Sequence, residues 1–280
     1  MRVSISGYHA WLTRPQSARN EQEERLLVQI KTAHAQSQGT YGSPRIFRDL
    51  REDGWRISRK RIERLMRKHG ISARVKKRYR VTTDSKHNLP VAENLLDQKF
   101  EAEQANTRWA GDITYIWTGQ GWLYLAVILD LWSRRVVGWS MQEQLERALV
   151  LDALDAALRR RQPRPSNGLI CHSDRGSQYA SGDYQMVLRE HGIACSMSRK
   201  GNPWDNAGCE SFMKSLKYEE VLRNEYRDLG EARRSIHHFL EQVYNEKRLH
   251  SALGYHPPAE FERALLAQRQ ANEVECRSSL

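Results

Sequence analysis

Residues 198–218 read Ser-Arg-Lys-Gly-Asn-Pro-Trp-Asp-Asn-Ala-Gly-Cys-Glu-Ser-Phe-Met-Lys-Ser-Leu-Lys-Tyr, a basic loop followed by a helical pattern. Pro203 suits the first turn of a helix, because its missing N–H is not needed there. Glu210, Lys214 and Lys217 follow at helical spacing, so one face carries a carboxylate and then two cations. Taken alone, this pattern is typical of an ordinary exposed helix. Two acids earlier in the chain favour another interpretation.

Both of these acids interrupt strand patterns. Asp112 lies in residues 109–117, Trp-Ala-Gly-Asp-Ile-Thr-Tyr-Ile-Trp, a β-branched and aromatic run in which an Asp opposes strand propensity. Asp174 follows the short apolar run 169–173, at the carboxyl end of a predicted strand, where ligands gather in α/β sheets. The sequence therefore predicts one acid on a strand, one at a strand end and one, Glu210, on a later helix.

Three separated carboxylates without Cys or His partners are typical of a site for a hard cation. We expect Asp112, Asp174 and Glu210 to hold two Mg²⁺ or Mn²⁺ ions rather than zinc. Two such ions in one carboxylate cluster are the usual arrangement for in-line phosphoryl transfer. In this interpretation Asp112 bridges the two ions, and each of the other acids holds one. The alternative is three unrelated surface acids.

Four motifs, in this order, resemble those of the DDE transposase and retroviral integrase superfamily. The fourth narrows the resemblance to insertion-sequence transposases of the IS-three group, in particular the product of their second reading frame. The resemblance covers roughly residues 20–265. The motifs are Trp-x-x-Asp-Ile-Thr-Tyr at 109–115, His-Ser-Asp-Arg-Gly-Ser-Gln-Tyr at 172–179, Gly-Asn-Pro-Trp-Asp-Asn-Ala-x-x-Glu-Ser-Phe at 201–212, and Tyr-Asn-x-x-Arg-x-His-Ser-Ala-Leu-Gly-Tyr at 244–255.

The resemblance implies an enzyme that cleaves DNA at the ends of a mobile element and joins the freed 3′-hydroxyl to target DNA. It also implies DNA as partner (terminal repeats and target), the first-frame protein of the same element as a second partner, and a homo-multimer on DNA. Two alternatives remain open: a non-catalytic DNA-binding regulator of transposition, and a nuclease of the same fold that cleaves without joining. A tyrosine- or serine-recombinase chemistry has no supporting Arg-rich His/Tyr signature.

Charge is distributed unevenly along the 280 residues, which carry a formal net charge of +11. Residues 1–100 contain 22 Lys and Arg against 10 Asp and Glu, whereas residues 101–280 contain 23 against 24. Nearly all of the excess positive charge therefore lies in the first third. This distribution predicts a nucleic-acid-binding module joined to a near-neutral core.

The basic third also carries a helix-turn-helix pattern. Two short helices are predicted, the first starting after residue 43 and the second at 59–69, and the second is rich in Arg and Lys. A small helical bundle with a charged face is the alternative. We expect DNA contacts from this helix and from the basic run that follows, in particular from Arg59, Lys60, Arg64, Lys76, Lys77 and Arg78.

Weaker candidates for DNA contact lie in the last three motifs and in the helical pattern that continues beyond the third. Arg175, Lys214 and Lys217 could meet phosphates near the metal ions, with surface salt bridges as the alternative. Asn206 could orient DNA, but capping the helix that starts beside it is the safer interpretation. Arg248 belongs to the closing motif, for which structural docking against the core is the alternative. His172 is expected to be a hydrogen-bonded histidine at a strand end rather than a metal ligand.

The predicted fold class is α/β: a small all-α helix-turn-helix domain followed by a ribonuclease-H-like core with a mixed five-stranded sheet and flanking helices. Three antiparallel strands followed by alternating helices and strands give this order. Expected domains are a loosely ordered lead-in at 1–20, the helix-turn-helix domain at 21–73, a basic linker at 74–104 with a short helix at 91–100, the catalytic core at 105–265, and a polar tail at 266–280. A last short helix is expected to start at 257–261, with disorder beyond about residue 270.

Other sequence features indicate the cellular compartment in which the protein is expected. The N-terminus shows no secretory pattern, and no apolar run approaches the ~20 residues that span a bilayer. The four cysteines are scattered without a Cys-x-x-Cys pair, which argues against a zinc site or a disulfide framework and fits a reducing environment. We therefore expect a bacterial cytoplasmic protein with no membrane partner, located on the nucleoid when bound to DNA.

Overall fold

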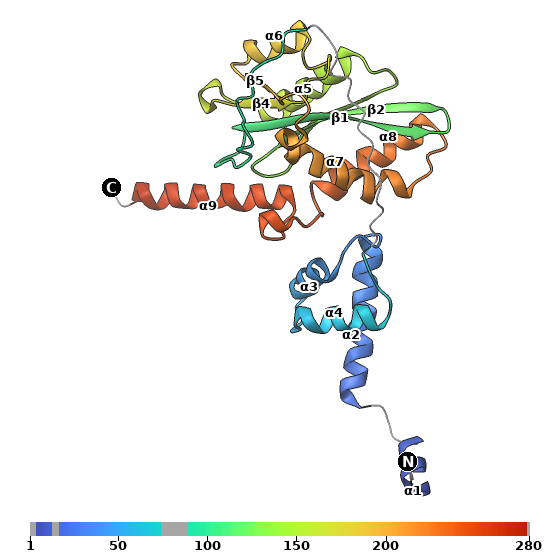
Figure 1. Ribbon diagram of the computed structural model, residues 1–280. Helices are drawn as coiled ribbons and strands as arrows, with labels where there is room; N and C mark the ends of the chain where they lie inside the picture. The colour runs from blue at the N-terminus through green and yellow to red at the C-terminus, as the bar shows by residue number, and fades with distance from the viewer. Residues whose placement is uncertain (1–3, 13–16, 74–88, 279–280) are drawn as a thin grey trace. The chain divides into compact units, whose positions relative to one another are not determined.

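The computed structural model describes residues 4–12, 17–73 and 89–278. The chain divides into two compact units, Met1–Lys76 and Lys77–Leu280, and each has its own hydrophobic core (Figure 1). Within the described ranges, no helix is both long and apolar enough to cross a membrane.

The first unit is helical. Its core is formed where α2, α3 and α4 pack together, through Leu26 and Ile30 of α2 and the apolar faces of the two shorter helices. Ser58 caps α4, because its side chain accepts a hydrogen bond from the Arg61 N–H at 3.3 Å. This is the predicted all-helical N-terminal region. The helices are α1 (Ile5–Leu12), α2 (Ala18–Gln36), α3 (Ser43–Glu52) and α4 (Arg59–Lys68).

The second unit is built on one five-stranded sheet with the order β3-β2-β1-β4-β5. The first three strands are antiparallel, and β4 and β5 continue the sheet in parallel to β1. The parallel half places the carboxyl end of β4 beside the middle of β1. The strands are β1 (Arg108–Thr118), β2 (Gly121–Asp130), β3 (Val136–Gln142), β4 (Ile170–Ser173) and β5 (Ala194–Met197).

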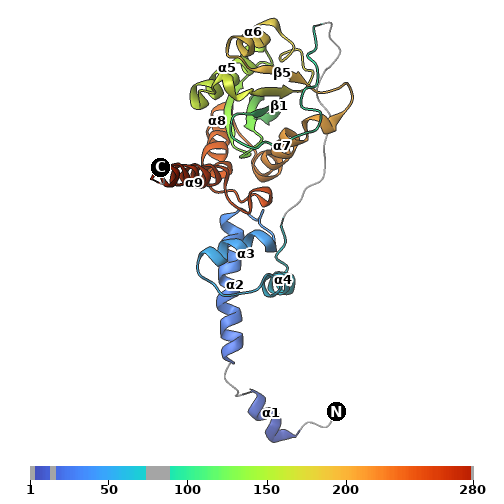
Figure 2. The ribbon, with the colours of Figure 1, turned by 90° about the vertical axis from the view of Figure 1, so that its left-hand side faces the viewer.

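Helices cover both faces of this sheet, as Figures 1 and 2 show. Alternate residues of β2 pack on the two sides, so Ala126 and Ile128 face α5 and α6, while Val127 and Leu129 face α7 and α8. This is the predicted ribonuclease-H-like arrangement. The helices are α5 (Arg147–Arg161), α6 (Gly182–Glu190), α7 (Ala207–Glu219), α8 (Leu229–His238), a π-helical turn (Phe239–Tyr244) and α9 (Pro258–Ser278), with short 3-10 turns at Pro165–Asn167, Pro203–Asn206, Val221–Arg223 and Ser251–Leu253.

The structure differs from the sequence expectations near three segment ends. The lead-in expected to be loosely ordered contains α1, and α2 already begins at Ala18. No helix forms over 91–100; Leu96 is instead buried against the core, and the Leu95 N–H donates to the Ser196 hydroxyl at 2.9 Å. At the other end, α9 continues to Ser278, where a disordered tail was expected. Contacts far along the chain order the segment around Leu96, and local patterns do not reveal them.

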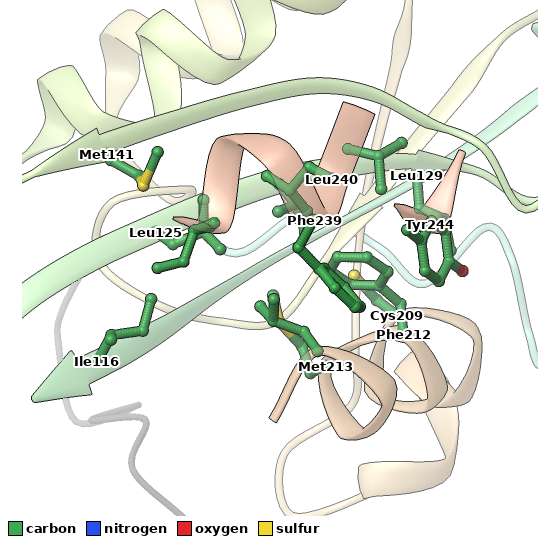
Figure 3. Close-up of a cluster of buried hydrophobic side chains, with 14 of the residues drawn as sticks. Ile116, Leu125, Leu129, Met141, Cys209, Phe212, Met213, Phe239, Leu240 and Tyr244 are labelled. Carbon is green, nitrogen blue, oxygen red and sulfur yellow. The ribbon is translucent and has the colours of Figure 1, made fainter. Parts of the chain in front are cut away.

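The closing motif docks on the core. The Asn245 side chain is 1% exposed and pairs with the backbone of Val136 at the start of β3, accepting from its N–H and donating to its carbonyl, both at 3.0 Å. Tyr244 packs its ring on Phe212 of α7 with centroids 4.8 Å apart. Figure 3 shows Tyr244 within the apolar cluster beneath the sheet. The motif therefore fastens the segment after α8 to both β3 and α7.

We expect Asn245→Ala to lower the free energy of unfolding by about 1–3 kcal/mol, because it leaves the buried Val136 N–H without a partner and leaves the Val136 carbonyl only the Arg160 Nη1 at 3.4 Å. Urea unfolding followed by tryptophan fluorescence measures this change. Gln144→Ala, at an exposed position, is the control and should change the free energy little. Equal stabilities of the two variants would contradict the docking role of Asn245.

Candidate active site

Asp112 sits in the middle of β1, opposite Val127 of β2. Its side chain is half-buried, and its Oδ1 accepts a hydrogen bond from the Ile113 N–H at 2.8 Å. The residue before it is Gly111, where an added Cβ would stand 3.3 Å from the hydroxyl oxygen of the buried Tyr179. The glycine thus lets a tyrosine from the Asp174 motif pack directly against the strand that carries Asp112.

Asp174 follows the last residue of β4. The strand pairs in parallel with β1, with His172 opposite Ala110, so each acid lies two residues beyond this pair. The Asp174 Oδ1 accepts the Gly176 N–H at 2.9 Å, which fixes the carboxylate at the turn. Parallel register therefore places the two acids at the same level of the neighbouring strands β1 and β4.

Glu210 lies in the first turn of α7 and is half-buried. Two contacts fasten this turn to β1: the Asn206 Nδ2 donates to the Gly111 carbonyl at 3.2 Å, and the Cys209 thiol lies 3.8 Å from the Ala110 carbonyl. Both backbone groups immediately precede Asp112. The start of α7 is therefore held against the strand at the position of the first acid.

These contacts correct one expectation about Asn206. The residue occupies the N-cap position of α7, but its side chain makes no capping hydrogen bond. Its amide is directed instead to the carbonyl of Gly111, 95 residues away in sequence. The Oδ1 of Asn206 has no hydrogen-bond partner among the described residues, although the side chain is 6% exposed.

The charges of Asp174 and Glu210 affect the pKa of Asp112. Removal from water raises the pKa of Asp112 to about 8, and the charges of Asp174 and Glu210 act in the same direction, against the Ile113 N–H and Lys217. Burial also raises the pKa of Glu210. It lowers the pKa of Lys217, an effect that the Asp112 charge opposes. Burial and the two neighbouring acids therefore both disfavour the charged form of Asp112, and Lys217 partly offsets this effect.

Oxygen donors of this kind fit a hard divalent cation. The side chains offer carboxylate oxygens without sulfur, and the mutual repulsion seen at Asp112 is what a bound cation would relieve. As they stand, however, the described residues contain no group of three or more His, Cys, Asp or Glu side chains close enough to hold a metal ion. The three acids therefore fit a divalent cation through the type of their donor atoms and through their negative charge.

Cations predicted to contact DNA near the acids fall into two groups. Lys214 is exposed on α7, Lys217 is half-buried near Asp112, and the Arg175 Nε donates to the Ser198 carbonyl at 2.6 Å. Arg248 is 8% exposed and forms a bidentate pair with Glu219, at 2.7 and 2.8 Å. This burial argues against the predicted DNA contact of Arg248 and favours its structural alternative.

In the helix-turn-helix unit, Arg59 and Lys60 are exposed at the start of α4. Arg64 is paired with Glu23 of α2. The predicted contacts Lys76, Lys77 and Arg78 lie outside the described residues.

His172 is hydrogen-bonded, as expected for a strand-end histidine. Its two ring nitrogens lie 2.8 Å and 3.1 Å from the hydroxyl oxygens of Ser196 and Ser198. Burial lowers the pKa of His172 to about 4, so the ring is neutral near pH 7.

The sequence alone indicates no chemical role for Asp205. It is fully buried and is contacted by Arg199, Asn94, Gln98 and Asn202. The Arg199 guanidinium, more than any other group, holds the pKa of Asp205 well below its usual range. The only sequence signal for this role is its position in the Gly-Asn-Pro-Trp-Asp-Asn-Ala motif.

Known families match both units. A model described as HTH-like domain matches residues 21–79, and two models described as Integrase core domain match residues 102–203 and 191–258. The insertion element IS600 uncharacterized 31 kDa protein of Shigella sonnei is 43% identical over 259 residues, covering 92% of this chain and 94% of the relative. Transposase InsF for insertion sequence IS3A of Escherichia coli (strain K12) is 41% identical over 269 residues, covering 95% and 93%.

Among solved structures, the HTLV-2 integrase catalytic core domain in complex with magnesium, in its trimeric form, is 16% identical. It matches with a TM-score of 0.43 and covers 57% of this chain and 99% of that chain.

The raised pKa of Asp112 predicts a pH-dependent stability. Between about pH 4, where an ordinary Asp titrates, and about pH 8, the folded chain retains a proton that the unfolded chain has lost. The free energy of unfolding should therefore fall as pH rises through this window, and Asp112→Asn should reduce that fall. Urea unfolding in EDTA at several pH values across the window measures it, with the exposed Asp155→Asn as control. Parallel pH profiles of wild type and Asp112→Asn would contradict this assignment.

Proposed function

The chain belongs to the insertion-sequence transposases related to InsF of IS3, which combine an HTH-like domain with an integrase core, and from this premise we propose that it cleaves and joins DNA. The reaction is metal-dependent strand cleavage at the ends of an insertion sequence, followed by strand transfer of the freed 3′-hydroxyl into target DNA. It is the chemistry of a polynucleotidyl transferase. The outcome is DNA transposition, a form of DNA recombination and integration.

One observation carries the proposal most directly. Asp112, Asp174 and Glu210 come from a strand, a strand end and a helix, and the pKa of Asp112 responds to the charges of the other two. A protein that needed only a stable fold would gain nothing from placing two acids where their charges disfavour the ionisation of Asp112, because such repulsion opposes folding. Perturbed carboxylates of this kind are typical of functional sites.

We assign the metal ions to these three side chains. Asp112, Asp174 and Glu210 would together hold two Mg²⁺ or Mn²⁺ ions. When bound, such ions supply Lewis-acid activation of the attacking oxygen and stabilisation of the leaving oxygen. The backbone N–H groups of Ile113 and Gly176 each occupy one carboxylate oxygen, of Asp112 and Asp174 respectively, and so restrict the rotation of both acids.

The chain's other residues bind and orient the DNA. Water attacks the phosphodiester at the element end, and the bond to the leaving oxygen breaks to free a 3′-hydroxyl. That hydroxyl then attacks a target phosphodiester, so one P–O bond forms as another breaks. Lys214, Lys217 and Arg175 are assigned to phosphates flanking the reacting group, with Asn206 beside them. No side chain acts as a covalent nucleophile.

The helix-turn-helix unit would bind the terminal repeats. Arg59 and Lys60 are exposed at the start of α4, the position from which a recognition helix contacts DNA. Arg64 would join them by exchanging its pair with Glu23 for a phosphate. The basic run with Lys76, Lys77 and Arg78 extends this positive charge along the sequence.

Full activity is proposed to need partners. By family resemblance these are the first-frame protein of the same element and further copies of this chain on DNA, in the bacterial cytoplasm. A nuclease that cleaves without joining, or a DNA-binding regulator without catalysis, are the competing functions. The retention of all three acids disfavours the regulator.

Glu210→Gln tests the catalytic assignment. We expect wild type, with its first-frame partner and Mg²⁺ or Mn²⁺, to nick and join a supercoiled plasmid that carries the element's ends. Glu210→Gln should bind the same DNA but lose both reactions, because the amide cannot provide an anionic metal ligand. The exposed Glu225→Gln is the matched control and should retain activity.

The products distinguish the candidate functions. Nicking without joining would show that the protein acts as a nuclease and not as a transposase. DNA binding without cleavage, with either metal and with or without the partner, would leave a regulator. Joining that survives in Glu210→Gln would remove this residue from the metal site.

A further inference from the structure

Trp204 is the most exposed of the described tryptophans, with 72% of its surface accessible. It lies in the 3-10 turn Pro203–Asn206, immediately before α7. Two other tryptophans are comparably exposed, but Trp11 stacks on Tyr8 and Trp117 packs edge-on against Trp122. Within the described part of the chain Trp204 contacts no other aromatic ring. Its indole therefore contributes little to the core.

The turn that presents this indole is held firmly. The next residue, Asp205, is fully buried and accepts hydrogen bonds from the Arg199 N–H and Nε at 2.8 and 2.9 Å. It also accepts from the side-chain amides of Asn94 and Gln98, each at 3.0 Å. The Trp204 N–H itself donates to the Asn202 Oδ1 at 3.2 Å. The highly exposed Trp204 side chain is therefore carried by a backbone that the buried Asp205 fixes.

The same loop is joined to both aspartate-bearing segments. The Ser198 N–H donates to the Ser173 carbonyl at 2.9 Å, directly before Asp174. At the other end of the loop, the Asn206 amide donates to the Gly111 carbonyl at 3.2 Å, directly before Asp112. The loop, and Trp204 with it, therefore borders the candidate active site at two points.

We propose that Trp204 is a stacking platform for an unpaired nucleobase of the DNA at the reacting end. The inference rests on the proposed function, because DNA must reach the three acids. A strand there would meet the exposed Lys200 and the half-buried Arg175 through its phosphates. The flat indole can stack on the π-face of a base, whereas Lys200 and Arg175 would contact only phosphates. Such stacking tolerates any base sequence.

The test distinguishes binding through bases from binding through phosphates. One probe is a labelled duplex of mixed sequence with a short single-stranded tail at one end. The second probe has the same duplex and the same tail phosphates but abasic tail nucleotides. Wild-type full-length chain should bind the base-bearing probe about tenfold more tightly, the size of one stacking contact. Trp204→Ala should lose this preference, and Trp204→Phe should retain part of it.

Trp117→Ala is the matched control, because Trp117 is also highly exposed but lies near the tip of the β1–β2 hairpin. It should keep the preference of wild type. A wild type that binds both probes equally, or a Trp204→Ala that still prefers bases, would overturn the inference and leave the proposed function intact. Failure of wild type to bind either probe would overturn both. A Trp204→Ala that changes sedimentation but not the preference would assign the indole to a contact between copies and overturn stacking.

Discussion

Burial of one acid beside two others is the constraint on which the second unit depends. Removal from water disfavours the ionisation of Asp112 most, and the charges of Asp174 and Glu210 act in the same direction. Left alone, such carboxylates would move apart and into water. The surrounding structure must therefore hold the three supporting segments more firmly than the charges push them apart.

Short-range polar contacts supply part of that hold. Each acid-bearing segment is fastened close to its acid: β1 through the Gly111 carbonyl and the end of β4 through the Ser173 carbonyl, each directly before the acid, and α7 through the amide of Asn206, four residues before Glu210. These contacts join backbone groups that cannot move without displacing whole elements. Fully satisfied, such a network rigidifies the site, while a broken one would leave buried polar groups unpaired.

The apolar layer beneath the sheet supplies the rest. Phe212 and Met213 of α7 pack with Phe239 and Leu240 against the strand residues above them, as Figure 3 shows. Burying a large apolar side chain contributes about 1.5–3 kcal/mol, so the several side chains of this layer outweigh the repulsion of three partly solvated charges. The closing motif completes the layer through Tyr244. This explains why a chain segment far from the acids in sequence belongs to the same functional unit.

The difference between local patterns and long-range contacts explains what the sequence could predict. Strands, helices and the three acids were predictable because periodicity and motif spacing are local: the β-branched and aromatic run at 109–117 lies within β1. Asn206 and Arg248 were not, since their partners Gly111 and Glu219 lie 95 and 29 residues away. A capping residue and a surface arginine are what local rules favour at those positions, but tertiary contacts placed both side chains inside. Asp205 is the clearest case, because the side chains of Asn94 and Gln98, 111 and 107 residues away, join the nearby Arg199 and Asn202 in making it the anchor of the loop before Glu210.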